Sequence, residues 1–134
     1  MWLETRFAAG LQKLNAGKRP VVLVKQTYTT GADLTKCLLA PGAGGAQQPG
    51  CKALSRSDVM AQFQSVDRMM DKVASGFSGA TTLDPKAYFC PGEACTIRDG
   101  AALFLRDSDH LTNDGSAYLI SRAKGELLKK IAGP

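Results

Sequence analysis

Four cysteines fall into two local pairs along this chain of 134 residues, and each pair brackets a loop too rich in Gly and Pro for regular structure. The first loop is CLLAPGAGGAQQPGC, from Cys37 to Cys51, and the second is CPGEAC, from Cys90 to Cys95. A disulfide offsets the disorder of such a loop, typically by ~2–4 kcal/mol, because it removes entropy from the unfolded chain. Zinc is the alternative, although zinc sites usually need closer cysteine spacing or more than the one histidine present. We therefore expect Cys37–Cys51 and Cys90–Cys95 disulfides, with no metal and no cofactor.

Disulfides indicate an oxidising compartment, yet the N-terminal stretch MWLETRFAAGLQKL lacks the basic start and apolar block of a secretory signal. No apolar run approaches the ~20 residues that cross a bilayer. The simplest expectation is a chain cut from a longer exported or membrane-anchored polypeptide.

The composition is that of a globular protein, with 44% hydrophobic and 22% charged residues, and the length fits a single domain over residues 1–134. The net charge of +5 comes from scattered Lys and Arg, of which KGELLKK is the densest cluster. Nucleic-acid readers more often show a basic stripe with interleaved aromatic residues. We expect no nucleic-acid partner.

Apolar residues recur at helical spacing in three segments. The first predicted helix covers residues 2–15, and the second begins at Ser55 or Ser57, since serine is a good N-cap. The third begins at Asn113 or Asp114. Their expected buried faces are Leu3, Phe7, Leu11 and Leu14; Val59, Phe63, Val66, Met70 and Val73; and Ser116, Ile120, Ala123, Leu127 and Ile131.

Two strands separate these helices. RPVVLVKQ is a β-branched run without alternation, as expected of a strand covered on both faces of a parallel sheet. SGFSGATTLDP predicts a turn, a short strand and a proline stop. TIRDGAALFLRD predicts a small hairpin or an extended arm, with Asp99–Gly100 in its turn. Alternating helices and strands indicate a three-layer α/β fold with a parallel sheet. Because such sheets normally have more strands, we expect this one to be incomplete at the N-terminus, with an exposed edge able to recruit a second copy.

The stretch DSDHLTNDG contains the only histidine of the chain. Asp107 precedes His110 by three residues, so its carboxylate can accept the imidazole Nδ1–H and leave Nε2 free as a base. A surface turn whose aspartates cap the following helix is the simpler alternative. Calcium is a weaker one, because an EF-hand loop needs an oxygen ligand at position 5 and Gly at position 6, where Leu111 and Thr112 stand.

Together with its neighbours, this stretch resembles a known family. YFCPGEACTIRDGAALFLRDSDHLTNDGSAYL closely resembles the C-terminal end of the SGNH (GDSL-type) hydrolase domains fused to bacterial acyltransferase-3 membrane proteins. Those domains share a cysteine-bracketed loop, an arm ending in RD and a D-x-x-H-L-[ST]-x-x-G-A motif. The segments LQKLNAGKRPVVLVKQ and DRMMDKVAS…TTLDPKAYFC resemble helices and strands further upstream, although this chain has TYTT where relatives usually carry proline.

The resemblance implies a flavodoxin-like, three-layer fold, of which residues 1–134 form the C-terminal portion as one SGNH-like domain. It makes Asp107 the orienting aspartate and His110 the general base, and gives Asp109 no role. The implied function is an esterase or O-acyltransferase that acts on acyl esters, with acetyl the expected group, of cell-envelope polysaccharide. The implied partners are the acylated glycan or acyl donor and a membrane acyltransferase portion of the parent chain, on the periplasmic or extracytoplasmic side of a bacterial membrane.

The nucleophilic serine of this family lies in a G-D-S motif near the N-terminus, and no such motif is present here. Ser108 lies between the two expected catalytic residues, where its side chain points elsewhere. Ser78, in SGFSG, comes closest to a nucleophile elbow but follows a predicted helix rather than a strand. We therefore expect this chain alone to be nearly inactive. The alternative function is a non-catalytic domain that binds a glycan or a protein.

Overall fold

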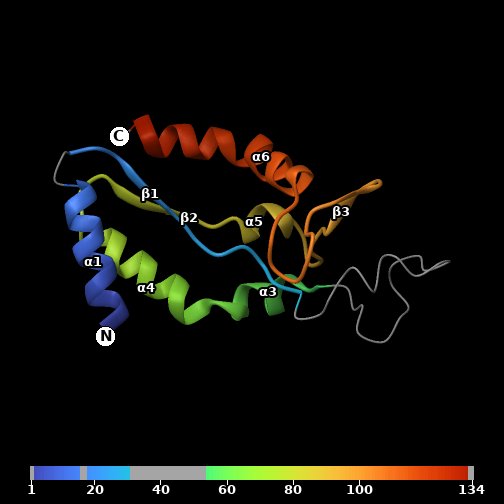
Figure 1. The fold of residues 1–134 in the computed structure, drawn as a ribbon, viewed down its shortest axis with the longest axis horizontal. Helices are drawn as coiled ribbons and strands as arrows, with labels where there is room; N and C mark the ends of the chain where they lie inside the picture. Colours follow the sequence, from blue (N-terminus) through green and yellow to red (C-terminus); the bar gives the residue numbers. More distant parts are fainter. Residues whose placement is uncertain (1, 16–17, 31–53, 133–134) are drawn as a thin grey trace.

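The computed structural model describes residues 2–15, 18–30 and 54–132, and Figure 1 shows them as layers of helices on both sides of a small sheet. In the sheet, β1 (Val21–Val24) and β2 (Ala80–Leu83) pair in parallel, with Val21 opposite Ala80. The helix α6 (Asn113–Ala132) lies over one face, and α4 (Gln64–Ser75) with α1 (Trp2–Asn15) lies over the other. The remaining elements are α3 (Arg56–Gln62), α5 (Lys86–Phe89), β3 (Arg98–Asp99) and β4 (Ala102–Leu103).

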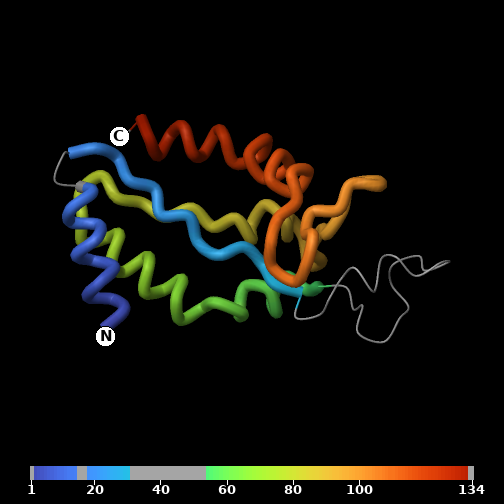
Figure 2. Tube along the Cα trace, viewed as in Figure 1, coloured from blue at the N-terminus to red at the C-terminus, as the bar shows by residue number. Residues whose placement is uncertain are grey.

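This arrangement confirms the predicted α/β class with a parallel sheet. Figure 2 shows the two strands running side by side in the same direction between the helices. No third strand joins them among the described residues. The expectation that β1 is covered on both faces is wrong at its end: Val22 packs against the core, but the Val24 side chain is 54% exposed.

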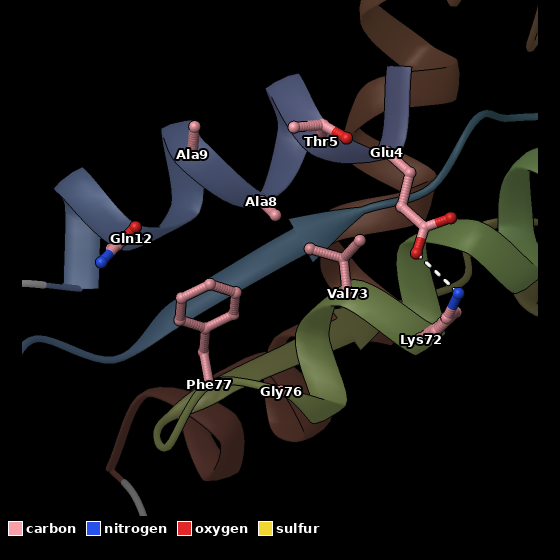
Figure 3. Close-up of a pocket in the computed structure, with 9 residues that line it drawn as sticks. All are labelled: Glu4, Thr5, Ala8, Ala9, Gln12, Lys72, Val73, Gly76 and Phe77. Carbon is pink, nitrogen blue, oxygen red and sulfur yellow. Dashed lines mark ion pairs between the residues drawn. The ribbon is translucent and has the colours of Figure 1, made fainter. Parts of the chain in front are cut away.

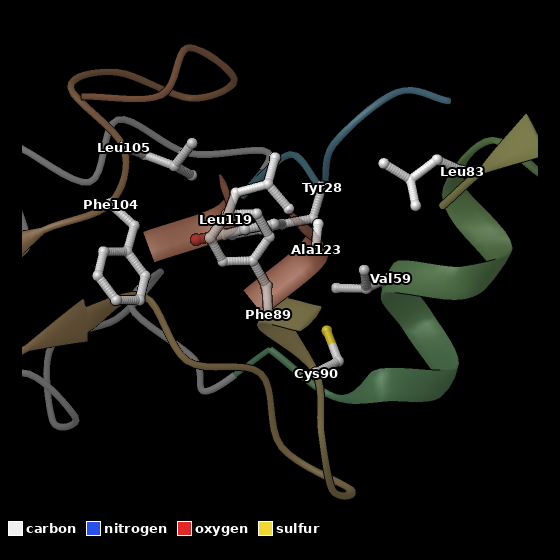
Figure 4. Close-up of a cluster of buried hydrophobic side chains, with 9 residues drawn as sticks. All are labelled: Tyr28, Val59, Leu83, Phe89, Cys90, Phe104, Leu105, Leu119 and Ala123. Atoms are coloured by element: carbon white, nitrogen blue, oxygen red, sulfur yellow. The ribbon is translucent and has the colours of Figure 1, made fainter. Parts of the chain in front are cut away.

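The core lies around the ring of Phe89, which follows β2 and ends α5 (Figure 4). Its ring centroid is 5.1 Å from that of Tyr28, 5.7 Å from Phe104 and 5.5 Å from Tyr118, so the core joins four separate parts of the chain. Two of these ring pairs are tilted and the Tyr118 pair is stacked, and aromatic pairs at such separations stabilise beyond the area they bury. The buried members of the cluster are Tyr28, Val59, Leu83, Phe89, Cys90, Phe104, Leu105, Leu119 and Ala123.

A disulfide joins Cys90 to Cys95 next to this core. Cys90 is fully buried, and the backbone N–H of Cys95 donates to the Leu54 carbonyl at 2.8 Å. The disulfide loop is therefore fixed to the start of α3. The expected Cys37–Cys51 pair lies outside the described residues.

The second predicted helix is present but broken. Ser55 is its N-cap, accepting from the Asp58 N–H at 3.1 Å, while Phe63 (φ −119°, ψ 22°) separates α3 from α4. The break changes the buried face: Val66, expected inside, is exposed, and Asp67 is buried in its place. The physical reason is an ion pair, because the fully buried Lys86 ammonium lies 2.8 Å from the Asp67 carboxylate.

The two outer helices begin and end close to prediction, but their buried faces differ from it. On α1, Leu11 is buried while Leu3 and Leu14 are exposed, because the main packing partner of this helix is α4. On α6, Ile120 and Ile131 are exposed. The buried face of α6 consists of Gly115, Leu119 and Ala123.

The predicted hairpin is confirmed, with Arg98 opposite Leu103 and Asp99 opposite Ala102. Gly100 has φ +56°, a conformation that glycine adopts without the strain a side chain would cause. Within the described ranges, no helix combines the length and apolar character that a membrane span requires.

Candidate active site

The turn that contains the histidine connects β4 to α6 and closes on itself at its base. Leu105 and Leu111 form an isolated antiparallel bridge, and the Arg106 N–H donates to the His110 carbonyl at 2.9 Å. At the next position of the stem, further from the tip of the turn, the Thr112 N–H donates to the Phe104 carbonyl, also at 2.9 Å. Residues 106–110 therefore project as a compact turn from a paired stem.

The start of α6 fixes where this stem lies. The Thr112 hydroxyl accepts the Gly115 N–H at 2.9 Å, so Thr112 is the N-cap, and the helix is not capped by an aspartate as the simpler alternative supposed. A Cβ at Gly115 would lie 2.2 Å from the Phe104 carbonyl oxygen. Only glycine lets the first turn of α6 approach the backbone before the histidine turn this closely.

Asp107 organises the turn from within. Its Oδ1 accepts the backbone N–H of His110 at 2.7 Å and that of Asp109 at 3.1 Å. These two backbone donors, together with His110, hold the pKa of the Asp107 carboxyl well below its usual range. The carboxylate is ionised, and an ionised carboxylate can only accept hydrogen bonds.

The imidazole of His110 lies against this carboxylate, with Nδ1 3.0 Å from Asp107 Oδ1 and 2.9 Å from Oδ2. Since Asp107 can only accept, Nδ1 carries a proton in this contact, and in the neutral ring Nε2 keeps its lone pair. The side chains are open to solvent, 62% exposed for His110 and 44% for Asp107. The pair can therefore act as a base towards a hydroxyl that approaches Nε2.

The same turn brings together three groups that can bind metals. Asp109 Oδ1 lies 3.3 Å from His110 Nδ1, and ligand atoms of Asp107, Asp109 and His110 all lie within 4.8 Å of one another. Exposed acidic groups often cluster in this way without an ion. A divalent cation would compete with the Asp107–His110 hydrogen bond for the same atoms.

The segment that follows β1 holds the tip of the turn. The Thr30 N–H donates to the Ser108 carbonyl at 3.0 Å, and the Thr29 hydroxyl donates to the same oxygen at 3.0 Å. The turn therefore lies beyond the carboxyl ends of the parallel strands, the edge at which open α/β sheets bind their ligands. These contacts come from the stretch TYTT, residues 27–30.

No described serine hydroxyl hydrogen-bonds to the His110 ring. The Ser108 hydroxyl instead donates to Asp109 Oδ1 at 3.2 Å. Ser78 precedes β2 and so lies at the amino end of the sheet, opposite the end at which Thr30 meets Ser108. The structure brings Asp107 and His110 together, but no serine of the described ranges hydrogen-bonds to this pair through His110.

A groove of about 610 Å³ lies between α1 and α4, away from this turn (Figure 3). The Glu4–Lys72 ion pair of 2.7 Å crosses one end of it, and Ala8, Val73 and Phe77 form part of its apolar lining. None of the residues that line it is a candidate catalytic residue.

Sequence reasoning missed Gln62, whose side-chain amide bonds the backbone of Thr29, and the threonines that contact Ser108. It also missed the buried Lys86–Asp67 pair. Of the residues that position the histidine turn, Gly115 alone could be recognised in the sequence, because it is the glycine of the D-x-x-H-L-[ST]-x-x-G motif. The other residues act through partners far away in the sequence.

Comparisons with known proteins agree with these observations at the level of the family. A family model described as "SGNH domain (fused to AT3 domains)" matches residues 3–124, a span that includes β1, β2 and the Asp107–His110 turn. No curated protein and no solved structure gives a significant match.

Proposed function

Because this chain belongs to the family of SGNH domains fused to AT3 domains, we propose that it is an esterase or O-acyltransferase domain. The observation that carries the proposal is the exposed Asp107–His110 pair beyond the carboxyl ends of the parallel strands. The proposed substrates are acyl esters, chiefly acetyl, of cell-envelope polysaccharide. We further propose that the domain lies on the extracytoplasmic side of a bacterial membrane, where the membrane acyltransferase portion of its parent chain delivers the acyl group.

In the proposed reaction, His110 Nε2 takes the proton of a serine hydroxyl as the serine oxygen attacks the ester carbonyl. The imidazolium is stabilised by the Asp107 carboxylate at Nδ1, and it returns the proton to the departing alcohol oxygen. This leaves an acyl-serine, which is cleaved in a second step by water or by a glycan hydroxyl. The same imidazole deprotonates that second hydroxyl.

The 134 residues contain no G-D-S motif, and no described serine lies at the histidine, so we assign the nucleophile to a polypeptide segment outside this sequence. The isolated chain should then hydrolyse aryl acetates barely above the background rate. A longer polypeptide of the parent protein that supplies the serine should be active. In this polypeptide, His110→Ala should abolish turnover, whereas the neighbouring change Asp109→Asn should leave it within a few fold.

Two controls accompany this experiment, and one outcome would contradict it. A serine-directed phosphonate should label the longer polypeptide and not the isolated chain. Activity should survive EDTA, which separates the acid–base pair from a metal bound by Asp107, Asp109 and His110. Saturable turnover by the isolated chain that disappears in His110→Ala would show that the nucleophile lies within these 134 residues.

The second candidate function is a non-catalytic domain that binds a glycan or a protein, and the observation that favours it is the lack of a described serine at His110. Glycan binding by the longer polypeptide, with no esterase activity, would support it. In either function, we propose that residues 1–134 act as one domain and that copies associate through the outer edge of β1.

A further inference from the structure

The side chain of Gln62, the last residue of α3, pairs with the backbone of Thr29 in the manner of a neighbouring strand. Its Nε2 donates to the Thr29 carbonyl at 2.7 Å, and its Oε1 accepts the Thr29 N–H at 2.9 Å. A side-chain amide that satisfies both backbone groups of one residue fixes the position and the orientation of that peptide. Gln62 therefore anchors the chain just beyond β1, where Figure 1 shows the end of the light blue segment close to α3.

The anchored residue is also a support of the histidine turn. The Thr29 hydroxyl and the Thr30 N–H each lie 3.0 Å from the Ser108 carbonyl oxygen. Ser108 lies between Asp107 and His110. Among the described residues, hydrogen bonds to its carbonyl attach the tip of the turn to the segment that follows β1.

The opposite end of this supporting segment is anchored by different groups. The Lys86 ammonium donates to the Gln26 carbonyl at 3.3 Å, and Tyr28 is fully buried in the aromatic core. Neither of these contacts acts on Thr29 or Thr30 directly. The bidentate amide of Gln62, by contrast, holds the Thr29 peptide directly, next to the point at which the two threonines meet Ser108.

We propose that Gln62 is a positioning residue for His110, acting through Thr29 and Thr30 on the Ser108 carbonyl. The proposal rests on the proposed function of His110 as a base. Gln62 touches neither the substrate nor the reacting atoms. Its role is to hold the turn so that Nε2 faces the incoming hydroxyl while Nδ1 stays on Asp107.

The test replaces Gln62 in two ways and uses an exposed neighbour as the control. Gln62→Leu removes both hydrogen bonds at similar size, and Gln62→Glu keeps the acceptor for the Thr29 N–H while losing the donor. Gln64→Leu is the matched control, because Gln64 is exposed and, among the described residues, its side-chain amide hydrogen-bonds to Arg68 rather than to the segment after β1. Thr29→Val keeps the backbone of Thr29 and removes its hydroxyl from Ser108.

Two readouts separate positioning from catalysis. The first is the imidazole ¹⁵N and ¹H spectrum of the isolated chain, which reports the tautomer of the only histidine without requiring activity. Gln62→Leu and Thr29→Val should shift or broaden these signals and those of the His110 backbone N–H, and Gln64→Leu should not. The second readout is the kinetics of ester hydrolysis by the longer polypeptide that carries the serine. In this polypeptide, Gln62→Leu should lower kcat about ten- to a hundredfold with little change in KM. Gln62→Glu should lie between Gln62→Leu and the unchanged chain in both readouts.

Unchanged imidazole signals in a folded Gln62→Leu chain would overturn the proposal, as would equal changes in Gln64→Leu. If Gln62→Leu does not fold, the same comparison is made with Gln62→Glu and Thr29→Val. Imidazole signals that respond as expected in a longer polypeptide with no esterase activity would instead reject the proposed function and leave the mechanical link from Gln62 to His110 established.

Discussion

The carboxylate of Asp107 has two roles. It closes the turn by accepting two backbone N–H groups, and it accepts the Nδ1–H of the imidazole. The spacing of aspartate and histidine was visible in the sequence because both roles are local. Gln62 was not predictable in this way. Its partner Thr29 is 33 residues away, and an exposed glutamine at the end of a helix has no pattern that predicts such a contact.

Asp107→Asn separates the two roles. The amide oxygen can still accept the backbone N–H groups, so the turn should persist, but the amide no longer requires a proton on Nδ1 and cannot stabilise an imidazolium. We expect kcat of the serine-bearing polypeptide to fall by roughly 10³–10⁴-fold, as when a triad aspartate is replaced by asparagine. The matched change Asp109→Asn should cost only a few fold, and similar losses in the two variants would reject the assigned role of Asp107.

Tyr28 should make the free energy of unfolding fall at alkaline pH. Burial, with a smaller contribution from Tyr118, raises the pKa of Tyr28 above its usual range. The phenol is favoured as neutral in the native state, whereas the unfolded chain ionises near its usual pKa of about 10. Its contribution to stability is therefore complete below about pH 10 and is lost as pH rises through the native pKa.

Tyr28→Phe should accordingly flatten the fall in the free energy of unfolding above about pH 10. The aromatic packing on Phe89 is kept, and the hydrogen bond that the hydroxyl donates to the Thr96 carbonyl is long at 3.4 Å. Urea unfolding at several alkaline pH values measures the slope. Equal slopes in the two proteins would mean that Tyr28 does not control the alkaline limit.

At the scale of elements, periodicity predicted where α1, β1, β2 and α6 lie but misjudged which faces they bury. On α6, the close approach of Gly115 to Phe104 turns Leu119 and Ala123 inwards and leaves Ile120 55% exposed. On α4, the buried Lys86 selects Asp67 over Val66. In both helices, a residue on another part of the chain, Phe104 or Lys86, determines which side chains are buried. The pattern of apolar residues within the helix therefore cannot predict the buried face.

The close approach of α6 can be tested with two glycines of the same helix. Gly115→Ala should destabilise the protein by about 1–3 kcal/mol, because its Cβ would lie 2.2 Å from the Phe104 oxygen. Gly125→Ala has nothing within 4 Å and should stabilise it by up to about 1 kcal/mol through helix propensity.

The free energy of unfolding in urea measures both changes, and the His110 signals should shift only in Gly115→Ala. A neutral Gly115→Ala would show that α6 can retreat from Phe104 at no cost.

At the scale of the whole molecule, the parallel sheet has only two strands among the described residues, and the outer edge of β1 has no partner strand there. The Val21 and Lys25 N–H groups donate towards β2, so the backbone groups of Val22 and Val24 face the other edge, where no described strand pairs with them. Edge strands of this kind recruit other chains. The alternation of helices and strands predicted the α/β class, but the number of strands in a sheet is set by long-range pairing and had no local signature.

We therefore expect the isolated chain to self-associate through β1. Light scattering over a concentration series should give a mass that rises above that of the monomer. Val24→Lys, which places a charge at an exposed edge position, should return the mass to the monomer value. A mass that stays monomeric for the unchanged chain at all concentrations would contradict this expectation.

The pairing of Val21 with Ala80 also has a consequence for how the protein folds. Its two strands are separated by more than a third of the chain, so the entropy of closing a long loop must be lost before their pairing contributes any stability. During synthesis, α1 and β1 leave the ribosome well before β2 does, so β1 cannot pair with β2 until residues 80–83 have emerged. Helix α4 and β2, adjacent in sequence, can associate first, and we expect the docking of β1 onto them to limit the rate of folding.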